Sequence, residues 1–101
     1  MARGRYRVQW ASPAIADLLE AVAFIRREQP SAARRLYTEI ERRTKPLRTH
    51  PTLGRIVPEF ENRHLRELIV PPFRIVYRLL PRDHRIEVFA VVHGSRRLPV
   101  N

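Results

Sequence analysis

The chain has 101 residues, enough for one core, and we expect residues 1–101 to form a single domain. It contains no cysteine, which excludes disulfides and thiolate chemistry, and its four scattered histidines argue against a structural zinc site; we expect no metal and no cofactor. The absence of cysteine fits a reducing cytoplasm, and no segment approaches the roughly eighteen apolar residues of a membrane span, so we expect a cytoplasmic protein without a membrane partner.

Positive charge dominates the composition. Twenty Lys and Arg against ten Asp and Glu give a formal net charge of +10 at pH 7. Such an excess favours acidic or polyanionic partners, such as nucleic acid, a ribosome or an acidic protein. All of the basic residues except Lys45 are arginine. Arginine suits bidentate recognition of phosphate or carboxylate, but a coding bias would give the same ratio, and composition alone leaves both explanations open.

The first half of the chain predicts a strand followed by two helices. Residues 6–10 alternate apolar and polar side chains, the period-two pattern of a half-buried strand. Ser12 as N-cap and a proline directly after it start a helix that should run to about residue 29. A second helix opens at Ser31, and Pro46 should kink or end it. The short connection predicts an antiparallel helical hairpin that covers one face of a sheet and leaves the other face uncovered.

The second half predicts a loop and then three strands. Residues 52–62 carry few periodic signals and should cross back to the sheet as a loop. The strands are expected at residues 65–70, 73–80 and 85–92. Short turns between them make these neighbours antiparallel. The predicted fold is therefore α+β, in the order β-α-α-β-β-β, with a small, mostly antiparallel sheet and the helical hairpin on one face.

Arginines interrupt the apolar strands of the second half. An arginine in a pleated apolar segment should point away from the core, so we expect Arg66, Arg74 and Arg78 on the uncovered face of the sheet, which would then be cationic. Glu67 follows Arg66 directly and must point to the opposite face. We expect it to be buried and paired, because a buried carboxylate without donors is unfavourable. Tyr77 falls on the core side, and we interpret it as a packing residue.

Strict alternation also assigns the faces of the last strand. Even-numbered residues from 86 to 92 should share one face, and odd-numbered residues from 87 to 93 the other. We interpret the aromatic residues Trp10, Phe24 and Phe89 as packing residues.

Several short motifs recur in a characteristic order along the chain. They are Trp10 with Ser12-Pro13-Ala14, Asp17-Leu18, Pro51-x-x-Gly54-Arg55, Leu65-Arg66-Glu67-Leu68, Phe73-Arg74-Ile75-Val76-Tyr77-Arg78 and His93-Gly94-Ser95-Arg96. Together they resemble the RelE/ParE toxin superfamily over nearly the whole chain. The resemblance implies the toxin half of a type II toxin-antitoxin pair, with an acidic antitoxin as its partner. The superfamily holds ParE-like toxins, which poison DNA gyrase, and RelE-like toxins, which cut messenger RNA on the ribosome, on one fold.

A nuclease of this superfamily would need a group that moves protons beside cations that stabilise the transition state. His93 is the one conventional acid/base candidate in the right region, with Arg66, Arg74 and Arg78 as charge stabilisers. RelE-like enzymes usually present basic residues with a tyrosine or histidine near the chain end, and this chain has no tyrosine after Tyr77. The commoner role of such a residue is structural, in which His93 closes the last strand and hydrogen-bonds to the backbone beside Gly94. The sequence therefore leaves open whether the protein is an enzyme.

The tail after the last strand, His93-Gly-Ser-Arg-Arg-Leu-Pro99, is more similar to that of ParE-like members. This resemblance implies a protein that binds gyrase and traps its cleaved DNA complex without breaking bonds itself. Arg96 and Arg97 then join the strand arginines as candidates for target or antitoxin binding, although a solvated charge pair would explain them too. We expect a ParE-like gyrase inhibitor first, a ribosome-dependent mRNA endonuclease second, and a nontoxic basic binding protein third.

Overall fold

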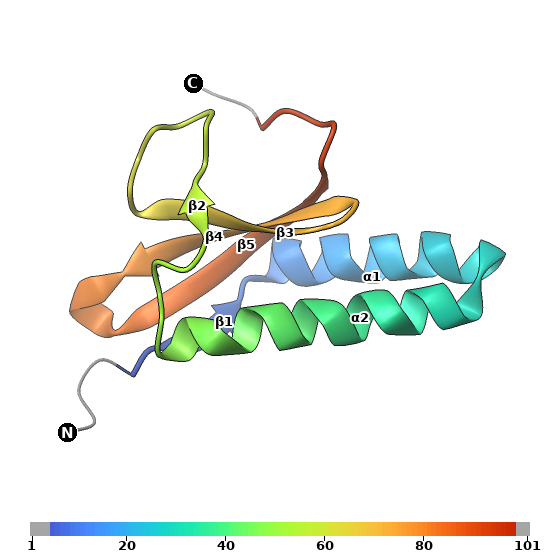
Figure 1. The fold of residues 1–101 in the computed structure, drawn as a ribbon, viewed down its shortest axis with the longest axis horizontal. Helices are drawn as coiled ribbons and strands as arrows, with labels where there is room; N and C mark the ends of the chain where they lie inside the picture. Colours follow the sequence, from blue (N-terminus) through green and yellow to red (C-terminus); the bar gives the residue numbers. More distant parts are fainter. Residues whose placement is uncertain (1–4, 99–101) are drawn as a thin grey trace.

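Two long helices lie side by side against one face of a five-stranded sheet in the computed structural model, which describes residues 5–98 (Figure 1). The elements are β1 (Arg7–Trp10), α1 (Ser12–Glu28), α2 (Pro30–Thr44), β2 (Arg55–Ile56), β3 (Leu65–Val70), β4 (Phe73–Leu80) and β5 (Arg85–His93), with single 3-10 turns at Lys45–Arg48 (η1) and Pro81–Asp83 (η2). The predicted α+β fold and helical hairpin are confirmed. The short strand β2 was not predicted, because two paired residues leave no periodic pattern.

Prolines set the limits of the helices. A single extended residue, Gln29, separates α1 from α2, and its carbonyl accepts the N–H groups of Ala32 and Ala33. The second helix therefore starts one residue before the predicted Ser31, because proline at the first helical position has no N–H to satisfy. The prediction that Ser12 is the N-cap of α1 is wrong. Ala11 is the N-cap, and it makes no side-chain hydrogen bond there. The α-helix ends at Thr44, two residues before Pro46, as predicted.

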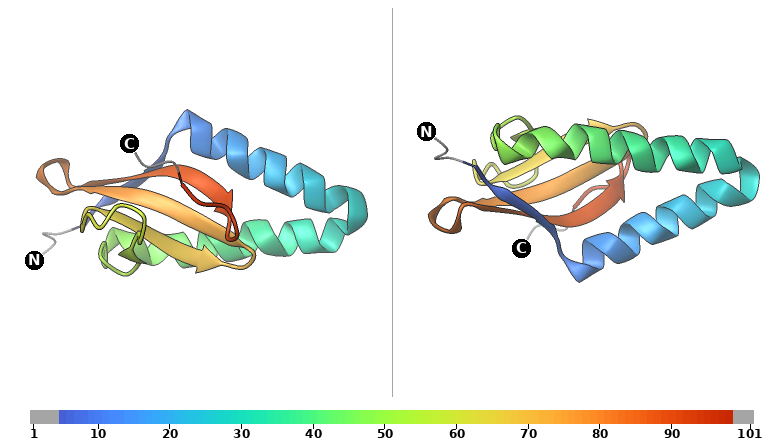
Figure 2. Two further views of the ribbon diagram at one scale, coloured as in Figure 1. Left: turned by 90° about the horizontal axis from the view of Figure 1, so that it is seen from above. Right: turned by 90° about the horizontal axis from the view of Figure 1, so that it is seen from below.

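The strand order is β1-β5-β4-β3-β2, and every pair is antiparallel except β1 with β5. The helices and strands β2 to β4 together form the long connection between the parallel partners β1 and β5, and the hairpin carries the chain from one edge of the sheet to the other. In Figure 2, α1 runs alongside β5 and α2 runs alongside β3, and each helix packs against that strand. Asp17, one of the motif residues, fastens α1 to the sheet, since its carboxylate accepts the N–H of Val91 at 3.1 Å. Within residues 5–98, no helix is long and apolar enough to cross a membrane.

The main core lies between the sheet and the helices. Its fully buried members include Ile40, Leu47, Ile75, Tyr77, Ile86 and Val88, and Trp10 packs against them. The packing role predicted for Tyr77 and Trp10 is thus confirmed. The same prediction is wrong for Phe24, whose surface is 64% exposed. The far end of the hairpin extends past the strands (Figure 2), and Phe24 is contacted by the guanidinium of Arg27, 5.9 Å from the ring centroid, without being buried.

The opposite face of the sheet, which we call the outer face, was predicted to be uncovered. The structure covers part of it with the loop after β2 and with residues 94–98, the C-terminal segment (Figure 1). Val57 of the loop and Leu98 of the C-terminal segment bury against Val76 of β4, and Phe89 packs beside them. Apolar side chains on this face require such a cover, because exposing them to water is unfavourable.

A β-bulge in β5 reverses the predicted alternation. Val88 pairs with Tyr77, whereas Ala90 pairs with Val76, so Phe89 is an extra residue with no partner of its own. Beyond the bulge, Val91 belongs to the main core and Ala90 to the outer face. The predicted faces are therefore wrong after residue 89, and His93 falls on the helix side of the sheet, opposite Phe73.

Candidate functional site

The three strand arginines do not share one open face, contrary to the prediction. Arg66 pairs with Tyr77 on the helix side, at the sheet edge, and its guanidinium donates to the carbonyls of Arg63 and Gly54 at 2.9 Å each. Arg74 and Arg78 lie on the outer face, but the Arg74 side chain is only 8% exposed, against 44% for Arg78. Of this trio, only Arg78 matches the predicted exposed position.

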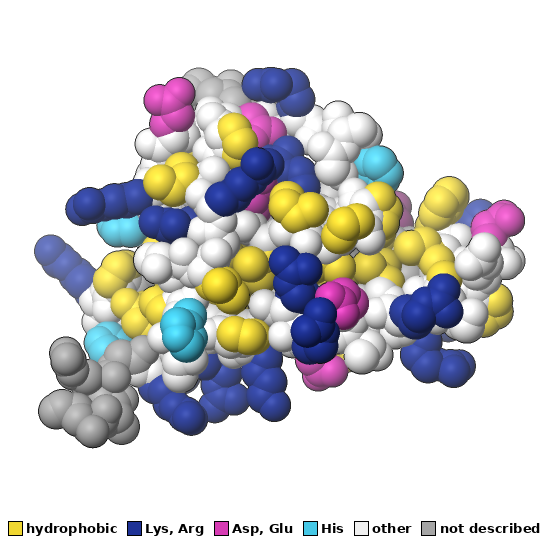
Figure 3. Space-filling view, viewed as in Figure 1, with side chains coloured by type: hydrophobic (Ala, Val, Ile, Leu, Met, Phe, Trp, Pro, Cys, Tyr) yellow, Lys and Arg dark blue, Asp and Glu magenta, His cyan; other side chains and the backbone are white. Residues whose placement is uncertain are grey.

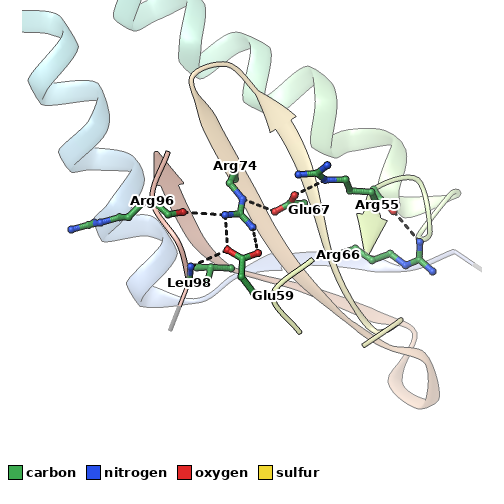
Figure 4. A network of polar contacts seen from close by, with 8 residues as sticks. Arg55, Glu59, Arg66, Glu67, Arg74, Arg96 and Leu98 are labelled. Carbon is green, nitrogen blue, oxygen red and sulfur yellow. Dashed lines mark hydrogen bonds and ion pairs between the residues drawn. The ribbon is translucent and has the colours of Figure 1, made fainter. Parts of the chain in front are cut away.

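Arg74 lies at the centre of an ionic network on the outer face, formed with the buried Glu59 and Glu67 and with Arg55, whose side chain is 61% exposed (Figure 4). Its Nε donates to Glu67 Oε1 at 2.7 Å, and its Nη1 and Nη2 donate to the two oxygens of Glu59 at 2.9 and 2.8 Å. The other oxygen of Glu67 accepts from Arg55 Nε at 2.6 Å. Bidentate pairing of this kind fixes a guanidinium in both position and orientation. We call these four residues the Arg74 network.

The strand register explains half of this network. Glu67 and Arg74 project from adjacent strands on the same face, two positions apart diagonally, which is within reach of long side chains. The prediction that Glu67 is buried and paired is confirmed, although it points to the outer face and not toward the helices. Sequence reasoning missed Glu59 because it lies in the loop without periodicity. The only available signal was that a buried arginine requires acids, and this loop contains Glu59 and Glu61.

The network also holds the C-terminal segment. Arg74 Nη1 donates to the carbonyl of Arg96 at 3.1 Å, and Glu59 Oε2 accepts the N–H of Leu98 at 3.0 Å. Arg96 and Arg97, both predicted to bind a partner, are exposed beside this attachment, and the Arg96 side chain points away from the network (Figure 4). They help to line a cleft of about 570 Å³ between the C-terminal segment and the β3–β4 turn, beside the exposed Ile69.

Hydrogen bonding to Arg74 and to the Leu98 N–H lowers the pKa of Glu59 from 4.5 to about 2, outweighing the effect of burial. At low pH the unfolded chain therefore binds a proton that the folded chain does not. Stability from Glu59 should be complete above pH 4.5 and disappear as the pH falls through about 2. Urea denaturation at pH 6, 4 and 2.5 should show the difference in unfolding free energy between the unsubstituted protein and Glu59→Gln shrinking with acidity. A constant difference would contradict this assignment.

His93, the predicted acid/base candidate, is exposed at the end of β5. Its Nδ1 accepts the N–H of Ser95 at 3.3 Å and lies 2.9 Å from the Ser95 hydroxyl. Because His93 lies on the helix side, it points away from Arg74 and Arg78. The structure therefore does not bring the predicted proton-transfer group and the predicted charge stabilisers together.

The Tyr77 hydroxyl is fully engaged inside the protein. It accepts the N–H of Gly54 and donates to the carbonyl of Pro51, both at 2.9 Å. Burial raises the pKa of Tyr77. This tyrosine is a structural residue that fastens the segment before β2 to the sheet.

Positive charge is not confined to the outer face. Basic side chains are spread over the helices and loops on the side shown in Figure 3, with apolar patches between them. Separately, a groove of about 360 Å³ lies between the helices, where Ile15, Leu19 and Tyr37 are exposed. The described residues thus present dispersed basic groups and an apolar groove between the helices, features of a protein that binds macromolecules.

Residues 8–98 match the profile of the ParE toxin of the type II toxin-antitoxin system parDE. The chain belongs to the ParE toxin family. It is therefore a toxin of a type II toxin-antitoxin system, and the resemblance predicted from its motifs is confirmed. A protein of Sinorhizobium fredii (strain NBRC 101917 / NGR234), Y4kP, which is named as a toxin, is 31% identical over 97 residues; the alignment covers 94% of this chain and 95% of that protein.

Two solved structures share the fold of this ParE-family chain. A chain of the chromosomal ParDE toxin-antitoxin system from P. aeruginosa superposes with a TM-score of 0.72 at 22% identity, over 89% of this chain and 97% of the other. A chain of the toxin-antitoxin complex RelBE2 from Mycobacterium tuberculosis gives a TM-score of 0.61 at 18% identity, over 88% and 98%. Both ParE-like and RelE-like proteins thus share this architecture, and the fold by itself does not choose between their targets.

Proposed function

We propose that this ParE-family toxin inhibits DNA gyrase by binding it and trapping its cleaved DNA complex. The observation that carries the proposal is the separation of His93 from the strand arginines, together with the burial of the Tyr77 hydroxyl. Acid/base catalysis of RNA cleavage needs a proton-transfer group within hydrogen-bond reach of the reacting atoms and cations beside it. Binding, in contrast, needs only exposed groups, and Arg78, Arg96 and Arg97 supply them.

An acidic antitoxin is the second partner in this proposal. The net charge of +10 favours association with an acidic chain. The groove between the helices offers an apolar surface that an amphipathic segment of such a chain can cover. The P. aeruginosa and M. tuberculosis relatives both come from toxin-antitoxin systems, which supports the same expectation.

A paired assay tests the target. Purified protein is incubated with gyrase and supercoiled plasmid, and separately with programmed ribosomes. We expect linear DNA to accumulate after protein denaturation in the first reaction and no A-site cleavage in the second. Ribosomal cleavage that disappears in His93→Ala would instead establish the endonuclease and overturn the proposal.

The exposed tail arginines should contribute to gyrase binding. We expect the double variant Arg96→Ala/Arg97→Ala to need about thirtyfold more protein for half-maximal trapping, which corresponds to about 2 kcal/mol for the two arginines together. The matched control is Arg42→Ala/Arg43→Ala, because these arginines pair with Glu39 on α2, away from the tail. Equal losses in both variants would show that total charge, and not the tail, determines binding.

A further inference from the structure

We propose that Arg74 and Glu59 are positioning residues that clamp the C-terminal segment to the outer face and thereby set the direction in which Arg96 and Arg97 project. The clamp itself is a property of the fold. Its consequence for target binding rests on the proposed function.

The two hydrogen bonds of the clamp lie on either side of Arg97. Arg74 holds the carbonyl of Arg96, and Glu59 holds the N–H of Leu98 (Figure 4). The backbone is thus fixed immediately before and immediately after Arg97. The Leu98 side chain is buried against Val57 and Val76, which adds an apolar anchor to the polar one. Apolar contact alone is not directional, whereas hydrogen bonds restrict both distance and angle.

The arginines of the clamp and the arginines that are available to a partner differ in their pairing and exposure. The Arg74 network contains two arginines and two glutamates, so its formal charge is zero. Arg74 uses its Nε, Nη1 and Nη2 on protein acceptors and is buried, which leaves it unsuited to bind an external anion. Arg96 and Arg97 form no ion pair within residues 5–98, and their side chains are exposed.

The clamp also shapes the cleft beside the tail. One wall of the cleft is the C-terminal segment and the other is the β3–β4 turn, so releasing the segment would change its width. A second attachment exists at the start of the segment, where Gly94 donates to the carbonyl of Pro72 at 2.7 Å. Loss of the clamp should therefore loosen residues 97 and 98, while Gly94 stays attached and the Arg96 N–H stays bonded to the His93 carbonyl at 2.9 Å. This local effect distinguishes a clamp from general stabilisation.

Amide hydrogen exchange tests the clamp directly. In Glu59→Ala the Leu98 amide should exchange about tenfold faster or more and lose its protection, whereas amides of β4 and β5 should stay strongly protected, although the lower global stability accelerates their exchange as well. Glu59→Gln keeps an acceptor oxygen and should restore much of the Leu98 protection. Glu39→Ala, which removes an ion-paired glutamate on α2, should leave Leu98 unchanged. Unchanged Leu98 exchange in Glu59→Ala, or equal acceleration at all amides, would overturn the proposal.

A double-mutant cycle in the gyrase assay tests the consequence. If the clamp acts through the tail arginines, adding Glu59→Ala to Arg96→Ala/Arg97→Ala should cause no further loss of trapping. Additive losses would show that Glu59 does not act through those arginines. If the unsubstituted protein does not trap gyrase, the proposed function fails, and the exchange experiment alone still decides whether the clamp exists.

Discussion

Replacing Arg74 with methionine should lower the free energy of unfolding by about 3–5 kcal/mol. Methionine preserves much of the side-chain length but leaves the Glu59 carboxylate without its guanidinium and Glu67 with only Arg55. The loss of stability comes mainly from the unpaired buried carboxylates. When one partner of a buried ion pair is removed, the desolvation penalty of the remaining charge is no longer offset.

Urea denaturation followed by circular dichroism measures this loss. Since domains of this size are stable by about 5–15 kcal/mol, Arg74→Met loses a large fraction of the total stability and should unfold at a clearly lower urea concentration than the unsubstituted protein. Arg78→Met provides the control, because its partly exposed pair with Glu87 should contribute about 1 kcal/mol or less. Adding Glu59→Gln and Glu67→Gln to Arg74→Met should recover part of the stability by removing the unpaired charges. An Arg74→Met variant as stable as Arg78→Met would refute the structural role assigned to Arg74.

Replacing Gly54 with alanine should destabilise the protein by about 1–3 kcal/mol or more. A Cβ atom there would lie 2.6 Å from the Glu67 carbonyl oxygen and 2.7 Å from the Tyr77 hydroxyl. Neither neighbour can yield easily, because one is sheet backbone and the other is a buried side chain with two hydrogen bonds. The expected displacement also weakens the bond from the Gly54 N–H to Tyr77.

Thermal denaturation compares this variant with a second glycine. Gly94→Ala would meet only the Pro72 carbonyl, at 3.2 Å, and should have a smaller effect. A loss of 1 kcal/mol lowers the midpoint by about 4–8 °C in a domain of this length, so the two variants are readily distinguished. Equal midpoints for Gly54→Ala and the unsubstituted protein would mean that the strand–loop contact can relax.

The sequence predicted the helices, the four longer strands and the family because their signals are local. Residues 6–10 alternate with period two, helical spacing fills both helices, and prolines 30 and 46 lie at helix limits. The ordered motifs supplied the family. Among the candidate site residues, local reasoning correctly gave the exposed Arg78 and the buried, paired Glu67.

Only the tertiary structure decided which groups meet. The bulge at Phe89 reverses the faces of β5 and directs His93 away from Arg74. The sequence of one strand does not show such a bulge, because the extra residue is apparent only when the strand is paired with its neighbour. Glu59 reaches Arg74 across fifteen positions, and Arg96 and Leu98 reach the same network from the far side. Such pairings depend on how loop and tail cross the sheet. The sequence by itself therefore determined the family, the elements and the excess of arginine, whereas three-dimensional packing decided that Arg74 is a buried anchor and that Arg96 and Arg97 remain exposed.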